Sequence, residues 1–298
     1  MTASTKEKIL IVLSFATIYI VWGSTYLASA FVIEEIQAYT ALAYRFCVAG
    51  IIALIILYLT RTKIETNKKE FGNAVIAGVI FLGLGTGGAI WSLNHLDSGF
   101  AALMIAADPL ILVLMIWVYR QTRPAAQTMV GIVLGILGIY LLVSQDSIIG
   151  GTDQLWGILA LFSSMVAWSV GAIFVADAKL PSNQFLNTSI QMIAGGLVCY
   201  LISLIFSEEG VNWFEMSAKT IYSMIFLIIF GSIAAFTAFN YLLKKVSTEK
   251  VVTNTYVNPI IAMILGAMFN EEIITNQSIV AAVIMLFGVF LINSRKTA

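Results

Sequence analysis

The sequence predicts an all-α integral membrane protein whose ten transmembrane helices form two inverted five-helix repeats. Three observations lead to this fold class. The chain is 60% hydrophobic and only 11% charged. Apolar stretches follow one another along almost all of its 298 residues. The second half repeats part of the first half, and the charge of one connector is reversed between the two copies.

Ten stretches are long and apolar enough to cross a bilayer as helices. A spanning helix needs about 20 mostly apolar residues, whereas the strands of a membrane barrel alternate in polarity. The predicted spans are 9–32, 38–60, 72–94, 98–119, 127–144, 154–176, 185–206, 220–242, 248–269 and 277–293. The longest polar connectors, near 61–71 and 207–219, are too short to form a soluble domain.

An internal repeat is visible without any gap. The segment Trp91–Leu142 aligns with Tyr241–Ile292 when it is moved forward by 150 positions, and this places Pro109 on Pro259. Self-similarity at a fixed offset indicates a repeated structural unit. The predicted units are residues 1–146 and residues 147–298.

The connector inside this alignment indicates that the two units are inverted. It reads Arg-Gln-Thr-Arg at 120–123 but Asn-Glu-Glu-Ile at 270–273. Lys and Arg are retained on the cytoplasmic side of membranes, so the two loops belong on opposite sides. If the N-terminus is cytoplasmic, 14 of the 16 basic residues lie inside, Lys219 lies outside and Arg45 lies within a span. Both termini are therefore expected in the cytoplasm.

Only two formally charged side chains, Arg45 and Asp108, lie deep within the predicted spans. A charge near the bilayer centre costs about 3 kcal/mol, so neither is expected to face lipid. One reading is a structural salt bridge between the second and fourth helices. The other is a functional role, either as a site for a substrate carboxylate or amine or as an Asp that takes up a proton.

The two aligned prolines follow Asp108 and Asn258, near the middle of their spans. Proline lacks the N–H that bonds the carbonyl four residues earlier, so Pro109 and Pro259 are expected to kink their helices. Kinked backbone is tolerated in a membrane where it lines a cavity. A kink that serves packing alone is the competing interpretation.

Aromatic residues give a second matched pair. Trp22 and Trp168 correspond at an offset of 146, and both are expected either to cover a central cavity as lids or to serve as packing. Trp91 lies near a helix end, where interfacial belts also favour such rings. The candidate substrate-binding residues are Trp22, Tyr26, Arg45, Trp91, Asp108, Trp168, Asn254, Tyr256 and Asn258.

Several classes of protein are disfavoured. With 16 basic and 16 acidic residues, the chain has no excess charge for nucleic acid. Its single histidine, His95, and two cysteines within apolar spans do not make a metal site, and no motif for a cofactor is present. An intramembrane enzyme would need a paired nucleophile and base, and the chain offers no Gly-x-Ser-x-Gly or His-Glu-x-x-His. A channel is the remaining rival class, which saturable counter-transport would exclude.

The chain resembles the drug/metabolite transporter superfamily, and within it the EamA-type permeases. The resemblance covers residues 9–293 and is carried by ten spans, Trp22-Gly23, Arg45-Phe46 and the paired mid-helix prolines. It implies a multi-pass carrier of the bacterial inner membrane, with a central cavity lined mainly by helices 1, 3, 4, 6, 8 and 9. Such carriers take amino acids, other metabolites or toxic organic compounds, and usually export them.

The resemblance has one departure. Members often carry a Glu after the penultimate helix of each half; here Glu271 or Glu272 fits the second half, whereas Arg123 occupies the first. We therefore expect a secondary transporter that moves a small-molecule substrate, an amino acid or a related compound, by alternating access across the bilayer. A multidrug or toxic-compound exporter of the same fold is the alternative. A monomer is compatible with the sequence, which leaves the oligomeric state open.

Overall fold

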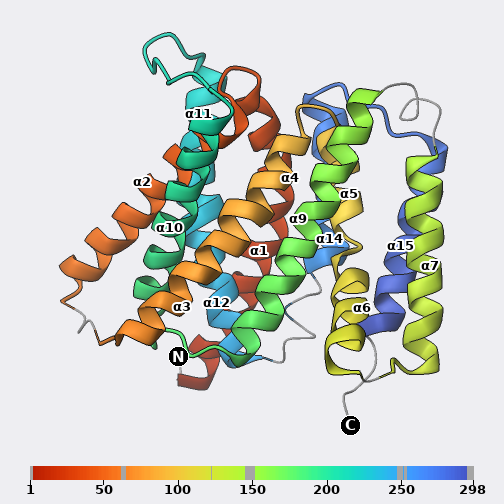
Figure 1. The fold of residues 1–298 in the computed structure, drawn as a ribbon, viewed down its shortest axis with the longest axis horizontal. Helices are drawn as coiled ribbons and strands as arrows, with labels where there is room; N and C mark the ends of the chain where they lie inside the picture. The colour runs from red at the N-terminus through yellow and green to blue at the C-terminus, as the bar shows by residue number, and fades with distance from the viewer. Residues whose placement is uncertain are drawn as a thin grey trace.

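The computed structural model describes residues 3–61, 65–121, 123–144, 152–246, 251 and 254–293 (Figure 1). Within these residues the secondary structure is helical throughout and no strand occurs. The all-α class is therefore confirmed. Figure 1 also shows that the beginning of the first helix and the end of the last helix lie at the same end of the bundle.

The helices follow one another with short connectors. In chain order they are α1 (Ala3–Ile33), α2 (Ala38–Leu59), α3 (Lys68–Gly78), η1 (Val79–Thr86), α4 (Gly87–Ser92), α5 (Ser98–Ile105), α6 (Asp108–Arg120), α7 (Ala126–Val143), α9 (Thr152–Asp177), α10 (Gln184–Ile205), α11 (Ala218–Phe226), η2 (Leu227–Ala234), α12 (Ala235–Lys245), α14 (Asn254–Phe269) and α15 (Asn276–Asn293).

Seven helical stretches within the described residues are long and apolar enough to cross a membrane, judged by length and composition. They are Lys6–Ile33, Ala38–Leu59, Lys68–Ser92, Ser98–Tyr119, Thr152–Val175, Gln184–Ile205 and Ala218–Phe239. Three shorter apolar helices, Ala126–Leu142, Val257–Phe269 and Asn276–Ile292, coincide with the other three predicted spans. A helix rises about 1.5 Å per residue, so these three are shorter than the apolar core of about 30 Å that a membrane presents.

Two of the long stretches contain a wide π-helical segment. η1 and η2 each span eight residues and begin at Val79 and Leu227, which are 148 positions apart. Each runs without a break into the α-helices on either side. The sequence predicts continuous α-helices here and gives no sign of the π geometry. Such segments are rare and are often found at functional sites.

The helices pack in pairs that come from opposite halves of the sequence. α2 packs along α10 at one side of the bundle, and α7 packs along α15 at the other (Figure 1). Between these pairs, α1 contacts α14 and α12, while α9 contacts α5, α6, η1 and α4. Helices from opposite halves of the chain are therefore direct neighbours throughout the described part of the molecule.

The fourth predicted span is broken at its aspartate and proline. α5 ends at Ile105 and α6 begins at Asp108, and the N–H of Leu110 donates to the carbonyl of Ala107 (2.9 Å). The structure thus has a break beside Pro109, where the sequence predicts a kink. Its counterpart Pro259 lies inside α14, which continues from Asn254 to Phe269. The two matched prolines therefore have different local structures.

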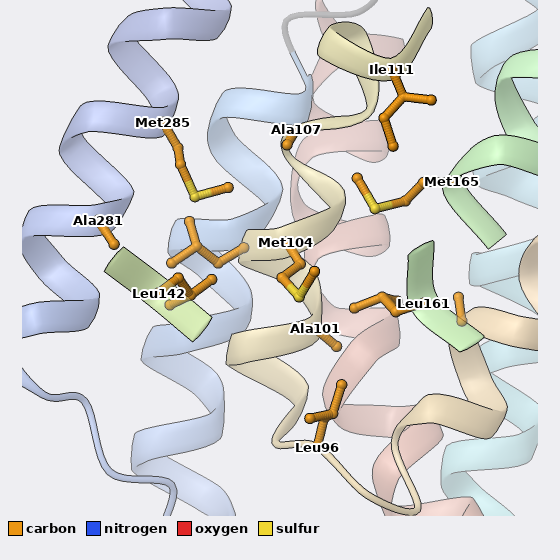
Figure 2. Packing of buried hydrophobic residues seen from close by; sticks show 12 residues of the cluster. Leu96, Ala101, Met104, Ala107, Ile111, Leu142, Leu161, Met165, Ala281 and Met285 are labelled. Atoms are coloured by element: carbon orange, nitrogen blue, oxygen red, sulfur yellow. The ribbon is translucent and has the colours of Figure 1, made fainter. Parts of the chain in front are cut away.

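A compact apolar cluster fixes the broken helix against its neighbours. Figure 2 shows small and flexible side chains from α5, α6, α7, α9 and α15 interlocking round the break. The fully buried members include Met104, Leu142, Met165 and Met285. Methionine is unbranched and adapts to irregular gaps, which suits the space that a helix interruption leaves.

Glycine allows α3 to approach α10 at backbone distance. A Cβ placed on Gly78 would lie 2.2 Å from the carbonyl oxygen of Gln191 and 2.6 Å from its Cα. Gly72 lies on the same helix, and a Cβ there would meet nothing within 4 Å. The absence of a side chain at Gly78 therefore allows the close packing of α3 on α10.

These two glycines make a matched test. We expect Gly78→Ala to lower the free energy of unfolding by about 1–3 kcal/mol, because the backbone of α10 must move away. Gly72→Ala is expected to be neutral or to stabilise the helix by up to about 1 kcal/mol, because alanine favours helical backbone. Thermal denaturation of the purified protein in detergent measures both changes. Equal effects of the two substitutions would contradict the packing described for Gly78.

Candidate functional site

The two matched tryptophans each contact the π-helix of the other half. Trp22 of α1 donates its indole N–H to the carbonyl of Gly231 in η2 (3.2 Å). Trp168 of α9 packs against η1, where a Cβ on Gly85 would come within 2.8 Å of the indole nitrogen. Its ring centre also lies 4.7 Å from that of Phe81. Gly85 leaves the space that the ring of Trp168 occupies, whereas Gly231 contacts Trp22 through its carbonyl group.

Arg45 meets the same π-helix as Trp22. It is only 7% exposed, and its Nε donates to the hydroxyl of Ser232 in η2 (3.0 Å). Its guanidinium also lies over the ring of Phe46, 5.2 Å from the ring centre. Within the described residues, Arg45 makes no ion pair with Asp108. The salt bridge between the second and fourth helices, one of the two sequence-based readings, is absent from the structure.

Asp108 begins α6, directly after the helix break. One oxygen of its carboxyl group, Oδ1, is buried and has no hydrogen-bond partner. Tyr26 lies on α1, which packs against α5, the helix that ends just before Asp108. The two predicted site residues therefore belong to neighbouring helices.

The matched residue in the second half, Asn258, makes hydrogen bonds that Asp108 lacks. Asn258 is 8% exposed. In the amide orientation that satisfies both of its ends, its Nδ2 donates to the carbonyls of Tyr19 (3.0 Å) and Ile18 (3.3 Å) on α1, and its Oδ1 accepts from Asn254 (3.3 Å). Asn254 and Asn258 thus attach α14 to α1. The side chain of Tyr256 lies outside the described residues.

Trp91 lies away from these contacts, at the end of α4. Its ring centre is 4.5 Å from that of His95, and His95 Nδ1 lies 2.9 Å from the Asp153 carboxylate on α9. His95 therefore links the end of α4 to the beginning of α9. A structural role at the end of the helix agrees with the position of both rings.

The strongest polar contact at this end of the bundle is one that the sequence leaves undecided. Glu272 accepts from the backbone N–H of Ser98 (3.0 Å), the Ser98 hydroxyl (2.5 Å) and the N–H of Gly99 (2.8 Å). Asp97, the residue at the N-cap position of α5, makes no such bond with its own side chain. A carboxylate at a helix N-terminus binds unpaired N–H groups and the positive end of the helix dipole. Of the two glutamates in the predicted acidic loop, Glu272 is the one that makes this contact.

Glu208 binds the N-terminus of α2 in the same way as Glu272 binds that of α5. Its carboxylate accepts from the backbone N–H of Tyr39 (3.3 Å) and of Thr40 (2.6 Å). The first-half helices α2 and α5 thus both have their N-termini held by a carboxylate from the second half. We call this end of the bundle, where Glu34, Glu35, Asp97, Glu208 and Glu272 lie, the acidic face.

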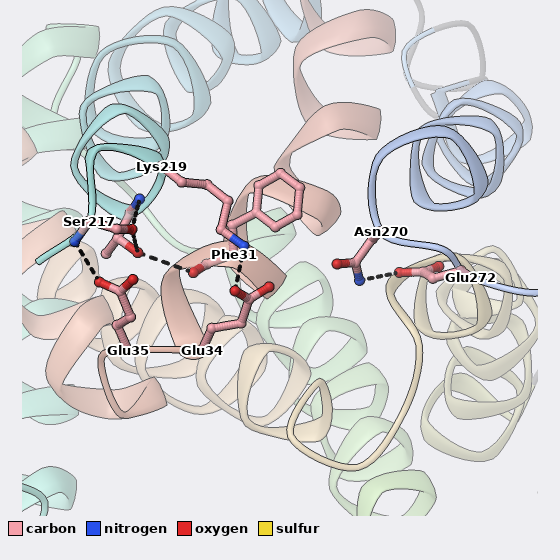
Figure 3. Close-up of polar contacts among 8 residues, drawn as sticks. Phe31, Glu34, Glu35, Ser217, Lys219, Asn270 and Glu272 are labelled. Atoms are coloured by element: carbon pink, nitrogen blue, oxygen red, sulfur yellow. Dashed lines mark hydrogen bonds and ion pairs between the residues drawn. The ribbon is translucent and has the colours of Figure 1, made fainter.

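Two further contacts on the acidic face tie α1 to α11 (Figure 3). Lys219 pairs with Glu34 and lies over the ring of Phe31, 4.5 Å from its centre. Glu35 accepts from the backbone N–H of Ser217 (2.9 Å), and hydrogen bonding from Ser217 lowers the pKa of this carboxyl group. The lone basic residue predicted on this side, Lys219, is therefore paired with an acidic neighbour.

A cavity of about 380 Å³ opens beside Glu272. Its polar lining includes Asp97, Gln154, Asn270 and Glu271, and the described residues that line it include neither Lys nor Arg. The Oε1 atom of Gln154 is buried without a hydrogen-bond partner. Partial burial and the nearby charge of Glu272 raise the pKa of Asp97 above its ordinary value. The cavity thus presents negative charge with an apolar floor.

Apolar helices that pack in cross-half pairs, with buried polar residues arranged round α1, define a multi-pass membrane protein. The EamA-like transporter family matches residues 9–144 and 155–294. The chain belongs to this family, and it is a transporter rather than an enzyme.

Curated relatives of this chain are transporters over nearly its whole length. "Uncharacterized inner membrane transporter YedA" of Escherichia coli strain K12 is 28% identical over 94% of this chain and 89% of its own. "Uncharacterized transporter YvbV" of Bacillus subtilis strain 168 is 20% identical over 98% of this chain and 94% of its own. A solved crystal structure shares the fold with a TM-score of 0.67 and 17% identity, covering 94% of this chain and 95% of that one.

Neighbouring glutamates test the contact that Glu272 makes. We expect Glu272→Gln to lower the free energy of unfolding by about 1–3 kcal/mol, because the N-terminus of α5 loses a charged acceptor. Glu271→Gln is the matched control, since Glu271 is exposed. Thermal denaturation at neutral pH and low salt measures both. A control that loses as much stability as Glu272→Gln would overturn the assignment of the contact to Glu272.

Asp97 is expected to make the folded state less stable as the pH rises. Its pKa is raised above the ordinary 3.8, so the folded protein binds this proton more tightly than the unfolded chain does. The side chain therefore costs stability as the pH rises from its ordinary pKa through the raised one. Asp97→Asn should raise the melting temperature at about pH 7 and have little effect near pH 4, where the carboxyl group is largely protonated. Melting curves across this range check the sign, and destabilisation at neutral pH would contradict it.

Proposed function

We propose that this protein is a secondary transporter in which two inverted five-helix repeats, residues 1–146 and 147–298, alternately expose a central site. Its substrate is a small organic metabolite, an amino acid or a related compound, which it exports. The observation that carries the proposal is the crosswise packing of the two halves. The name of the Escherichia coli relative and the apolar spans support a location in the bacterial inner membrane.

The crosswise contacts have the form that a two-fold axis produces. α2 packs on α10, and α7 packs on α15. Each of these helices therefore packs on its predicted counterpart in the other half. The contact of α1 with α14 is matched by that of α9 with α5 and α6, and the contact of α1 with η2 and α12 is matched by that of α9 with η1 and α4. Reciprocal contacts of this kind are expected when two like units are related by two-fold symmetry. In transporters with inverted repeats the axis lies in the membrane plane, and substrate binds between the units.

The π-helices and the tryptophans supply moving parts in matched positions. A π-helix has hydrogen bonds that differ from those of the α-helix on either side, so it can serve as a local hinge. Trp22 rests on η2 and Trp168 rests on η1, each from the opposite half. Rocking of the halves would shift each ring relative to its π-helix. In this way Trp22 and Trp168 would act as alternating lids.

The contacts on the acidic face favour a state that is closed on that side. Glu272 and Glu208 from the second half hold α5 and α2 of the first, and Lys219 of the second half pairs with Glu34 of the first. The bias of basic residues assigns this face to the outside and both termini to the cytoplasm. The first helix begins and the last helix ends at the end of the bundle opposite to the acidic face (Figure 1), which supports an even number of membrane crossings.

We propose that Asp108 couples transport to a gradient by taking up and releasing a proton. Its buried Oδ1 has no partner, whereas Asn258 at the matched position is hydrogen-bonded to α1. Uptake of a proton would remove the cost of an isolated charge in an apolar setting and would give the carboxyl group a donor. Such a site takes up a proton or a substrate amine in one state and releases it in the other.

A second candidate function rests on the acidic cavity. An exporter of amphipathic amines, of the multidrug or toxic-compound kind, would release its substrate through a space with acidic walls and an apolar floor. The cavity beside Glu272 has both features. Thermal-shift screening of the purified protein against amino acids, sugars and cationic drugs would choose between the two substrates.

The proposed role of Asp108 is tested in proteoliposomes with a panel of radiolabelled amino acids. Asp108→Asn should abolish uptake driven by a pH gradient, because the amide does not bind a proton at physiological pH, while the variant remains folded. Asp153→Asn, the same chemical change on the acidic face, should transport normally. Unchanged gradient-driven transport by Asp108→Asn would rule out this role. If the unaltered protein also shows no saturable counterflow, the transport mechanism itself fails.

A further inference from the structure

Arg45 is a buried cation without a counter-charge. A guanidinium carries five N–H donors and stays protonated in proteins. Apart from the contact of its charge with the ring of Phe46, Arg45 has one hydrogen bond, from Nε to Ser232. No carboxylate among the described residues pairs with it. Isolated charges are costly inside a membrane and usually mark pathways for substrates or ions.

A small cavity is lined by Arg45 and by a second residue that has an unpaired polar group. Ser29 of α1 lines it together with Arg45, and the rest of its lining is apolar. Ser29 is 2% exposed, and its hydroxyl has no hydrogen-bond partner. The cavity measures about 10 Å³, which is room for about one atom the size of a water oxygen. The lining of this cavity thus includes a residue with an unpaired hydroxyl and a cationic residue, the two kinds of group that bind an anionic oxygen.

The residue at the matched position in the second half has a hydrogen-bond partner within the chain. Gln191 corresponds to Arg45 at an offset of 146. It is 4% exposed, and its Nε2 donates to Asn187 on its own helix (3.0 Å). Gln191 thus has a partner on its own helix, whereas Arg45 has no carboxylate among the described residues. An acceptor supplied from outside the chain would bind on one side of the two-fold axis only.

We propose that Arg45 and Ser29, with Arg45 held in place by Ser232, bind the carboxylate group of the transported molecule. This inference rests on the proposed transport function and names the chemical group that the site selects. Ser29 lies on α1, Arg45 on α2 and Ser232 on η2, so the carboxylate is bound where helices of both halves meet. The cavity has room for one oxygen, so a whole carboxylate enters when α1 and α2 separate from the helices that contact them.

The site lies behind contacts that the acidic face provides. Glu208 fixes the beginning of α2, and the pair of Glu34 with Lys219 fixes the end of α1 to the beginning of α11. Release of these contacts would widen the space between α1, α2 and the eighth span. The same movement that opens the acidic face would therefore admit or release the carboxylate.

Matched ligands test the proposal on the unaltered protein in detergent. Phenylalanine is compared with phenylalaninamide, and leucine with leucinamide, by isothermal titration, because each amide lacks only the carboxylate. We expect at least one amino acid to bind about tenfold or more tightly than its amide, because a charge-assisted contact is lost. Equal affinities in both pairs, or no measurable binding of either amino acid, overturn the proposal.

Variants then assign the preference to the site. Arg45→Gln, which installs the residue of the second half, should abolish the preference for the carboxylate and leave binding of the amide unchanged. Ser29→Ala, which removes one unpartnered oxygen, should reduce the preference about threefold to tenfold without disturbing the fold. Arg123→Gln, which removes an exposed arginine, is the matched control and should keep the full preference. A folded Arg45→Gln protein that keeps the preference contradicts the proposal. If Arg45→Gln does not fold, an undiminished preference in Ser29→Ala has the same meaning.

Chloride is the other source of negative charge that must be distinguished. Titration of sodium chloride against sodium gluconate at constant ionic strength measures it directly. Thermal stabilisation by chloride that Arg45→Gln removes, without any preference for a carboxylate, would assign the site to a halide and overturn the proposal.

Counterflow in proteoliposomes distinguishes failure of the carboxylate site from failure of the proposed transport function. Saturable counterflow without a preference for carboxylates refutes this site and leaves the transport mechanism standing.

Discussion

The absence of water from the bilayer core is the constraint on which the rest of this structure depends. A polar group there must find its partner within the protein, because lipid offers none. Most polar side chains in the described spans obey this requirement through bonds to carbonyls or to neighbouring helices. Asn258 binds the carbonyls of α1, and Trp22 binds the carbonyl of Gly231. Against this background, a buried group without a partner is informative.

The unpartnered groups are distributed unevenly between the two halves. Asp108 and Arg45 belong to the first half, and both lack a full set of partners; their counterparts Asn258 and Gln191 are hydrogen-bonded. At these two matched positions the unsatisfied group lies in the first half, although Oε1 of Gln154 in the second half is also buried without a partner. In the proposed transport cycle, these asymmetric residues would let a ligand or a proton favour one packing of the two halves over the other.

Glycine and the π-helices connect this chemistry to motion. Gly231 leaves room for both Thr25 and the guanidinium of Arg45 beside η2, and Gly85 does the same for Trp168 beside η1. The residues proposed to bind and to cover the substrate therefore rest on the two segments with altered helical hydrogen bonding. On the acidic face, two carboxylates at helix N-termini hold the halves together through bonds that are strong but local. These few contacts are the ones that an opening of the acidic face, as proposed above, would have to break.

The sequence by itself determined the all-helical membrane class, the approximate spans, the internal repeat and the break at Pro109, because these follow from local hydropathy, from an offset between similar segments and from the covalent chemistry of proline. It also singled out Arg45 and Asp108, because a charged residue within an apolar stretch can be recognised from the sequence alone. The tertiary structure alone decided which groups these residues meet: Arg45 binds Ser232, 187 positions away, and not Asp108. It also selected Glu272 over Glu271 and revealed both π-helices. Such outcomes depend on how distant segments pack and on how each buried donor finds an acceptor, and no local pattern in the chain encodes either.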